Sequence, residues 1–202
     1  MFSILVHTFN RYSFAWPGFF KAWRENMNDY PVYWGSDMPG KGIPDGFIPI
    51  FSGPGEWSDR LINLVHQIPT DTIFYMQEDH WATKPVNLNL FYRHFRTMGL
   101  LRLQISPIVR YYTIYGENPP YFFDEKPKSK YLVAHNPGFW NKKFLLSCLE
   151  RGENPWLNEY KGTCRLWERG KEIEKKIAIY PMDWYHHAVE HGKLVKTKAL
   201  PW

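Results

Sequence analysis

Gln77, Glu78, Asp79 and His80 interrupt an apolar stretch at residues 73–83, IFYMQEDHWAT. Five residues that suit a buried strand, 72–76, come before Gln77, so the two carboxylates stand where a strand leaves the core. Carboxylates in that position can hold Mg²⁺ or Mn²⁺, which prefer oxygen ligands and often bind phosphate oxygens as well. Taken alone, the stretch is equally well explained as a solvated turn that caps a helix.

Polar residues also follow two earlier strands that the sequence predicts. After the first strand, residues 2–7, come Thr8, Phe9, Asn10 and Arg11. After the second, residues 31–34, come Gly35, Ser36 and Asp37. In open α/β sheets, ligands bind outside the carboxyl ends of the strands. If the strands are parallel, these groups therefore meet the acidic turn in one crevice.

The elements that position these residues alternate between strands and helices. Residues 2–7, 31–34, 47–51 and 72–76 have the composition of strands. A helix is expected over residues 18–27, and Trp57, Leu61, Leu64, Val65 and Ile68 recur at helical spacing. This alternation predicts an α/β fold with a mainly parallel sheet flanked by helices.

The second half of the chain is less regular. Helices are predicted at residues 89–98, 142–150, 166–176 and 184–191, and strands at 101–105, 111–115, 131–135 and 177–180. Residues 116–130 are rich in Pro and Lys and are expected to be a loop. We expect a single domain over 1–202, with 1–82 and 83–202 as its halves, which could belong to a longer protein.

Composition narrows the class of protein. Two cysteines, Cys148 and Cys164, are too few for a disulfide framework or a zinc cluster, so a reducing, cytoplasmic location is expected. The sequence predicts neither a signal peptide nor a membrane span.

The net charge of +5 weakly favours an anionic partner. Ten tryptophans exceed what a core needs, and Trp57, Trp140 and Trp156 are candidates for stacking on sugars.

The order VHTFNR, GSD, W-S-x-R-L and an apolar strand ending in EDH resembles the nucleotide-binding half of GT-A glycosyltransferases. The whole chain is similar to glycosyltransferase domains of chlorella viruses. The resemblance implies a mixed, mainly parallel, Rossmann-like GT-A fold. It also implies an enzyme that transfers a sugar from a UDP-sugar donor to a glycan acceptor with Mn²⁺ or Mg²⁺. No nucleic-acid partner is expected.

The resemblance also implies roles for particular residues. Asp79 would be the metal ligand, and Glu78 would assist at the metal or the ribose. Asp37 would lie near the uracil or ribose, and Arg60 would reach a phosphate or an acid of the motif. The other residues expected at the nucleotide-sugar are Thr8, Phe9, Asn10, Arg11 and Trp140. The chain departs from the family's Asp-x-Asp motif, because EDH contains a single Asp.

The second half contains the candidates for the acceptor side. His135 and Asn136 stand at a junction near Trp140, and Glu153 and Glu159 are both candidates for the catalytic base. We favour Glu159, because a helix that starts at Pro155 would aim it inward.

A C-terminal cluster contains further candidates. Either His187 or Asp183 is expected to return to the metal or diphosphate, as in similar transferases. A zinc site of His186, His187 and His191 is an alternative, although it would need a fourth ligand.

Other functions remain open at this point. A metal-dependent phosphodiesterase or nuclease would use similar residues but usually needs more acids to hold two metals. A carbohydrate-binding module would explain the tryptophans but not the acids at a strand end. A glycosidase needs two carboxylates across a sugar. For a transferase, no nucleophile is evident, so inversion is expected, with glucose or a deoxysugar such as rhamnose as the sugar.

Overall fold

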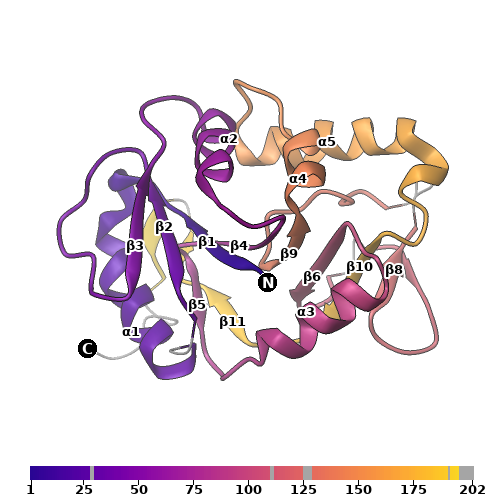
Figure 1. Ribbon diagram of the computed structural model, residues 1–202, viewed down its shortest axis with the longest axis horizontal. Helices are drawn as coiled ribbons and strands as arrows, with labels where there is room; N and C mark the ends of the chain where they lie inside the picture. Colours follow the sequence, from indigo (N-terminus) through magenta and orange to yellow (C-terminus); the bar gives the residue numbers. More distant parts are fainter. Residues whose placement is uncertain (28–29, 110–111, 125–128, 191, 196–202) are drawn as a thin grey trace.

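The computed structural model describes residues 1–202 except 28–29, 110–111, 125–128, 191 and 196–202. One nine-stranded sheet runs through the molecule in the order β3-β2-β1-β4-β9-β6-β10-β8-β7, with helices on both faces (Figure 1). Strands β1, β2, β3, β4, β6 and β10 run in one direction, so the sheet is mixed and mainly parallel, as expected. These strands and their antiparallel partners are β1 Ser3–His7, β2 Val32–Ser36, β3 Phe47–Phe51, β4 Thr72–Gln77, β6 Arg102–Ser106, β7 Ile114–Tyr115, β8 Tyr121–Phe123, β9 Gly138–Asn141 and β10 Ile177–Pro181.

In the described part of the chain, five α-helices pack against the sheet. Two small two-stranded sheets, called ribbons below, complete the fold. The helices are α1 Trp16–Asn26, α2 Trp57–Gln67, α3 Leu88–Thr97, α4 Lys142–Cys148 and α5 Pro155–Arg169, with short 3-10 turns at Asn10–Ala15 and Gly170–Glu172. The ribbons pair β5 His80–Ala82 with β11 Tyr185–His187, and β12 Val189–Glu190 with β13 Lys193–Leu194. None of the helices described is long and apolar enough to cross a membrane.

Asparagine caps set the start of three helices. The side chains of Asn87, Asn141 and Asn154 accept hydrogen bonds from backbone N–H groups in the first turns of α3, α4 and α5. Each cap satisfies one of the donors that a helix start leaves unpaired. In α5 the cap is followed by Pro155, which suits the first helical position.

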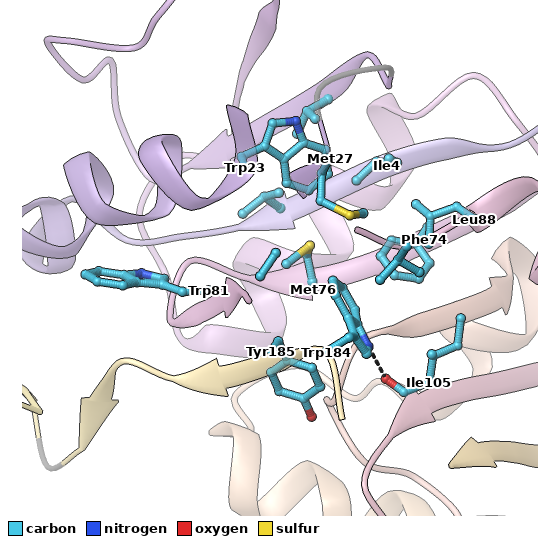
Figure 2. Packing of buried hydrophobic residues seen from close by; sticks show 14 of the residues in the cluster. Ile4, Trp23, Met27, Phe74, Met76, Trp81, Leu88, Ile105, Trp184 and Tyr185 are labelled. Atoms are coloured by element: carbon cyan, nitrogen blue, oxygen red, sulfur yellow. Dashed lines mark hydrogen bonds between the residues drawn. The ribbon is translucent and has the colours of Figure 1, made fainter. Parts of the chain in front are cut away.

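The two faces of the sheet have separate hydrophobic cores. One core contains residues of α1 and α3, and the other contains residues of α2, α4 and α5. Figure 2 shows the first, where Phe74 and Met76 of β4 lie near Trp184 and Trp81. The indole Nε1 of Trp184 donates to the carbonyl of Ile105 at 2.9 Å, so this buried polar atom is satisfied.

The β5–β11 ribbon is fixed against α1 by a glycine. A Cβ atom on Gly18 would lie only 1.9 Å from the Trp81 ring, so the helix can approach β5 because the side chain is missing there. Within the ribbon, His187 pairs with His80. This packing therefore determines where the two imidazoles lie.

Most of the predicted elements are confirmed, but several in the second half are wrong. Residues 184–191 contain β11 and β12 instead of a helix, and His191 lies outside the described residues. The helix predicted at 166–176 is the end of α5, which ends at Arg169 because Gly170 follows with a φ of 49°. The predicted loop at residues 116–130 contains the strand β8. Of the predicted strand 111–115, only Ile114–Tyr115 is a strand, and Tyr111 lies outside the described residues.

Residues 131–135 are irregular, with bends at Leu132 and Val133, and pair with no described strand; the strand in this region is β9. Side chains bind their backbone groups instead. Arg102 donates to the carbonyls of Leu132 and Ala134, at 2.9 Å each, and Val133 N–H donates to the Thr163 hydroxyl at 3.1 Å. The apolar residues suggested a strand because the segment is buried between the sheet and α5.

Gly138→Ala is predicted to destabilise the fold by about 2–3 kcal/mol, because overpacking of a rigid site has this order of cost. A Cβ there would lie 2.5 Å from the carbonyl oxygen of Leu103, in the neighbouring strand. Urea unfolding measures the change. In Gly42→Ala the new Cβ meets open space, and only the positive φ of 76° penalises it, by about 1 kcal/mol. Equal losses in the two variants would contradict the close-packing argument.

Candidate functional site at the carboxyl edge of the sheet

The carboxyl ends of the first strands meet at one edge of the sheet, as the sequence predicts. His7 at the end of β1 pairs with Gly35 of β2 on one side and with Gln77 of β4 on the other. The residues that follow these positions, Asp37 and Glu78 among them, therefore lie along the same edge. Strands β6 and β10 end there too, since they run parallel to β4.

Asp79 lies at the centre of a group that can hold a cation. The ligand atoms of Asp79, His80 and His187 lie within 4.8 Å of one another. Asp79 Oδ2 is 3.3 Å from His187 Nδ1, and its backbone carbonyl accepts from Ala188 N–H at 2.8 Å. Asp79 Oδ1 is buried and has no hydrogen-bond donor among the described residues. A buried carboxylate oxygen without a donor, beside an imidazole, fits a divalent cation.

The hydrogen bonding of His80 argues against a role as ligand. Its Nδ1 accepts from Gln77 N–H at 3.0 Å, and burial lowers its pKa to about 3, so the ring is neutral. A neutral ring whose Nδ1 is an acceptor carries its proton on Nε2, and neither nitrogen then has a free lone pair. His80 therefore stabilises the turn, and Asp79 and His187 remain as the better ligands.

Glu78 lies outside this group, although the sequence analysis expected it at the metal. The side chain is buried, and burial first and the Asp79 charge second raise its pKa well above the usual value. Arg60 opposes that rise. The pKa of Asp79 is lowered: burial works against this, but His80 and the hydrogen bond to His187 outweigh it. The pKa values of the two adjacent acids therefore move in opposite directions, and Asp79 is the more stable anion of the two.

The loop after β1 carries the residues expected at a nucleotide. The backbone N–H of Asn10 donates to Asp37 Oδ1 at 2.7 Å, which ties the ends of β1 and β2 together. The Arg60 guanidinium lies 4.2 Å from the Phe9 ring centroid and donates to the Gly55 carbonyl at 2.7 Å. Arg11 is exposed. These side chains line the edge beside Glu78.

Thr8 does not fit the role expected for it. Its side chain is buried, and its hydroxyl accepts from the indole Nε1 of Trp16 at 2.7 Å. Thr8 thus fixes α1 against the end of β1, and its side chain is not available to a nucleotide at the surface.

Glu159 reaches the site from α5. Its Oε1 accepts from the backbone N–H of His135 at 2.8 Å, and burial raises the pKa of its carboxyl group. The Tyr75 hydroxyl lies close enough to Glu78, Asp79 and Glu159 for all three charges to raise its pKa, after burial as the main cause. The structure therefore brings Glu159 to the same region as the acidic turn.

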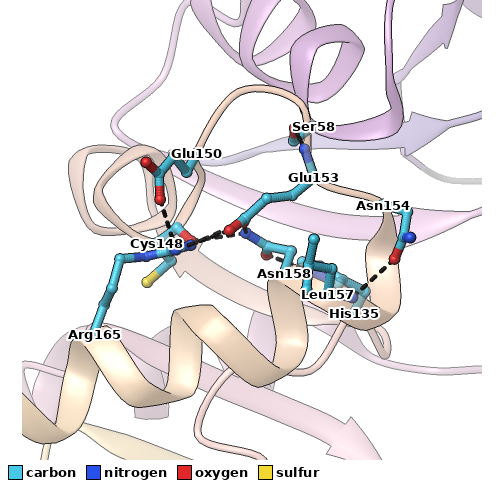
Figure 3. Close-up of polar contacts among 9 residues, drawn as sticks. All are labelled: Ser58, His135, Cys148, Glu150, Glu153, Asn154, Leu157, Asn158 and Arg165. Atoms are coloured by element: carbon cyan, nitrogen blue, oxygen red, sulfur yellow. Dashed lines mark hydrogen bonds and ion pairs between the residues drawn. The ribbon is translucent and has the colours of Figure 1, made fainter.

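Glu153, the other base candidate, belongs to a structural ion pair (Figure 3). Arg165 donates to both of its oxygens at 2.9 Å, and Asn158 Nδ2 donates to Oε2. Burial alone would raise the pKa of Glu153, but these hydrogen bonds outweigh it and hold the pKa below its ordinary value. A carboxylate stabilised in this way is a poor proton acceptor, so the expectation for Glu153 is wrong.

The tryptophans divide by exposure. Trp140 is fully buried with the Arg102 guanidinium 4.8 Å from its ring centroid, so its expected contact with a nucleotide-sugar is wrong. Trp57 is also buried, between His7 and His135. Trp156 is 76% exposed and remains free for stacking. Asp183 is exposed beyond the end of β10, and no contact in the structure decides its role.

Three tyrosines at this edge escaped the sequence analysis. The Tyr75 hydroxyl lies 3.5 Å from His7 Nδ1, and Tyr112 and Tyr185 bind the side chain of Asn136. They come from separate segments of the chain, so no spacing connects them in the sequence. Only the placement of Tyr185 beside His187 in the sequence offered a signal.

Comparisons with known proteins identify the fold. No protein-family model matches the chain, and no curated protein matches it in sequence. Among solved structures, residues 1–349 of S. aureus TarS in complex with UDP share 11% identity at a TM-score of 0.60. This match covers 91% of the present chain and 59% of TarS 1–349, and a longer TarS structure is covered to 36%, so the chain spans only part of that protein's length.

Two further structures support the same fold. Glucosyl-3-phosphoglycerate synthase of Mycobacterium tuberculosis, in complex with Mn²⁺ and UDP-glucose, has 9% identity and a TM-score of 0.61, covering 94% of this chain and 72% of that one. A CMP:2-keto-3-deoxy-manno-octonic acid synthetase complexed with CTP has 12% identity and a TM-score of 0.52, covering 90% and 88%. The chain thus has a GT-A-like fold. The organisms named for the first two structures are bacteria, which lend no support to a viral source.

Glu153→Ala is predicted to destabilise the protein by about 2 kcal/mol, because it leaves Asn158 and a partly buried arginine without their partner. The low pKa of Glu153 means that this stabilisation is present at neutral pH and is lost as the pH falls below 4.5 and through the folded-state pKa. Urea unfolding at several pH values measures both effects. The matched control is Glu150→Ala, since Glu150 binds the same Arg165 from an exposed position and contributes less than about 1 kcal/mol. A similar loss in both variants would contradict the structural role.

Proposed function

We propose that this chain is a metal-dependent glycosyltransferase that moves a sugar from a UDP-sugar donor to a glycan hydroxyl. The sugar is glucose or a deoxysugar such as rhamnose, and the configuration is inverted. Residues 1–82 supply the nucleotide-binding half, and residues 83–202 supply the acceptor-binding half. The observation that carries the proposal is the meeting of Asp79, His187 and Glu159 at the carboxyl edge of a GT-A-like sheet.

Asp79 and His187 are the proposed ligands of Mn²⁺ or Mg²⁺. The metal, when bound, offsets the charge of the departing diphosphate. Asp79 suits the role because its pKa is lowered and one of its oxygens is buried without a donor. Arg60 lies beside the acidic turn, and Arg11 lies in the segment after β1. Both would contribute cationic side chains to phosphate binding. Asn10 and Asp37, joined by their hydrogen bond, would contact the nucleoside.

Glu159 is the proposed base. Its pKa is raised by burial, which brings it closer to neutrality and makes the carboxylate a better proton acceptor than an exposed one. The hydrogen bond from His135 N–H occupies Oε1 and fixes the orientation of the side chain. Oε2 has no partner among the described residues, so it is the atom that would accept the acceptor's proton. No covalent intermediate is needed, which is consistent with inversion.

The other functions considered fit less well. A nuclease with two metals would need further acids, and the described residues contain a single group of the metal-binding kind. A binding module would not require a base of raised pKa beside the acids. A nucleotidyltransferase is a second candidate, because the chain covers 88% of the synthetase that was solved with CTP. Such an enzyme would bind a nucleoside triphosphate as its substrate.

The donor prediction is tested by calorimetric titration with UDP and with CTP, each with and without Mn²⁺. We expect UDP to bind at least about tenfold more tightly with Mn²⁺ than without it, because the cation joins Asp79 to the diphosphate. Absence of UDP binding, or binding that is indifferent to the metal, would overturn the proposal. Tight binding of CTP, with release of diphosphate from CTP when a sugar phosphate is added, would favour the nucleotidyltransferase.

Asp79→Asn is predicted to abolish the effect of Mn²⁺ on UDP affinity while leaving the fold intact, because Asn keeps the shape but removes the charge. Circular dichroism melting verifies the fold, and titration measures the metal dependence. The control is Asp71→Asn, which changes an exposed acid at the opposite end of β4. If Asp79→Asn keeps the wild-type metal dependence, Asp79 is not a ligand.

Glu159→Gln is predicted to lower the turnover number by about 10²–10⁴-fold with UDP affinity unchanged, because it removes the base and keeps the side chain's size. In the wild type, the rate should fall as the pH drops through the pKa of Glu159, which lies above the ordinary 4.5. Hydrolysis of UDP-glucose, with water as acceptor, provides the assay. A variant that retains the wild-type rate and acidic limb would exclude Glu159 as base.

A further inference from the structure

The amide of Asn136 is held in one orientation by two tyrosines. Its Nδ2 donates to the Tyr112 hydroxyl at 3.0 Å, and its Oδ1 accepts from the Tyr185 hydroxyl at 3.3 Å. Among the described residues, these two bonds leave one N–H and one lone pair of the amide without a partner. Asn136 is partly exposed, whereas the residues on both sides of it are buried. The side chain therefore presents a fixed donor and a fixed acceptor at the surface of the site.

A network of buried hydrogen bonds supports the contact between Tyr112 and Asn136. Gln104 Nε2 donates to the same Tyr112 hydroxyl at 2.8 Å, and Arg102 Nη2 donates to Gln104 Oε1. Arg102 also binds the carbonyls of Leu132 and Ala134, just before Asn136 in the chain. Arg102 and Gln104 are fully buried. A polar network of this extent inside a core has a cost in desolvation, and it fixes the position of the atoms it supports.

Asn136 lies between the two halves of the proposed site. The Tyr185 ring that binds it lies with its centroid 5.0 Å from that of His80 and 5.6 Å from that of His187. On the other side, the backbone N–H of the preceding residue, His135, binds Glu159. The amide thus stands between the proposed metal ligand and the proposed base. In a transferase the reacting sugar occupies that space.

We propose that Asn136 hydrogen-bonds a hydroxyl group of the donor sugar and selects among donors, which rests on the transferase function proposed above. A neutral amide with one free donor and one free acceptor matches a hydroxyl, which can both donate and accept. A site built to bind a hydroxyl discriminates against the analogue that lacks it, because its own polar groups are then left unpaired. Arg102 and Gln104 are positioning residues in this account.

The test compares UDP, UDP-glucose and the 2-, 3-, 4- and 6-deoxy analogues of UDP-glucose by calorimetric titration with Mn²⁺. In the wild type, one analogue should bind about 3–10-fold more weakly than UDP-glucose, the usual size of one neutral hydrogen bond. In Asn136→Ala that difference should disappear, while the affinity for UDP is unchanged. The matched control is Asn89→Ala, on the exposed surface of α3, which should keep the full difference.

Asn136→Asp keeps the shape and can still accept from Tyr185, so it serves if the alanine variant folds poorly. Asn136→Asp loses the N–H donor of the amide. If the wild-type amide donates a hydrogen bond to the sugar hydroxyl, the deoxy analogue that lacks this hydroxyl should bind Asn136→Asp as well as UDP-glucose does. The inference is overturned if every difference among the analogues persists in both variants, or if the wild type shows none. Because UDP binding is measured in parallel, failure of UDP to bind overturns the proposed function itself, and the two failures are distinguishable.

Discussion

The antiparallel pairing of β5 with β11 is the interaction on which the proposed site depends. It places His187 opposite His80, and so beside Asp79, although more than a hundred residues separate Asp79 from His187 in the chain. The ribbon is in turn positioned by Trp81, which fits against α1 because Gly18 has no side chain. The geometry of this candidate cation site is thus a consequence of packing at the end of the parallel sheet, where the last residues of β4 leave the core.

A second constraint acts from the opposite side of the site. The segment before β9 is not part of the sheet, and side chains of β6 and α5 bind its backbone where a neighbouring strand would otherwise do so. This arrangement brings Asn136 to the surface and presents the His135 N–H to Glu159. Buried hydrogen bonds that replace a strand ladder fix a geometry that regular pairing would not produce. Hydrogen bonds from buried side chains therefore fix the backbone on this side of the candidate site.

The sequence predicted the strands and helices of the first half well and those of the second half less well, for a physical reason. Parallel strands and amphipathic helices have local periodicity, so the convergence of the residues after β1, β2 and β4 could be predicted from spacing alone. Asp79 and Glu159 emerged in the same way, from a strand end and a proline helix start. Trp140 is excluded from the site because it is buried, and Glu153 is excluded because it binds Arg165, twelve residues further along the chain. Neither contact could be predicted from the spacing of residues in the sequence. The β5–β11 ribbon and the three tyrosines depend on tertiary contacts that leave no periodic trace.

The central claim is that a divalent cation at Asp79 and His187 joins the protein to the diphosphate of a UDP-sugar. A crystal structure of the protein with UDP and Mn²⁺, with anomalous data that locate the manganese, tests it most directly. The account predicts a manganese peak in contact with Asp79 and His187 and with the diphosphate, and a uridine beside Asn10 and Asp37. A manganese peak remote from Asp79, or a uridine bound away from the ends of β1 and β2, would contradict it.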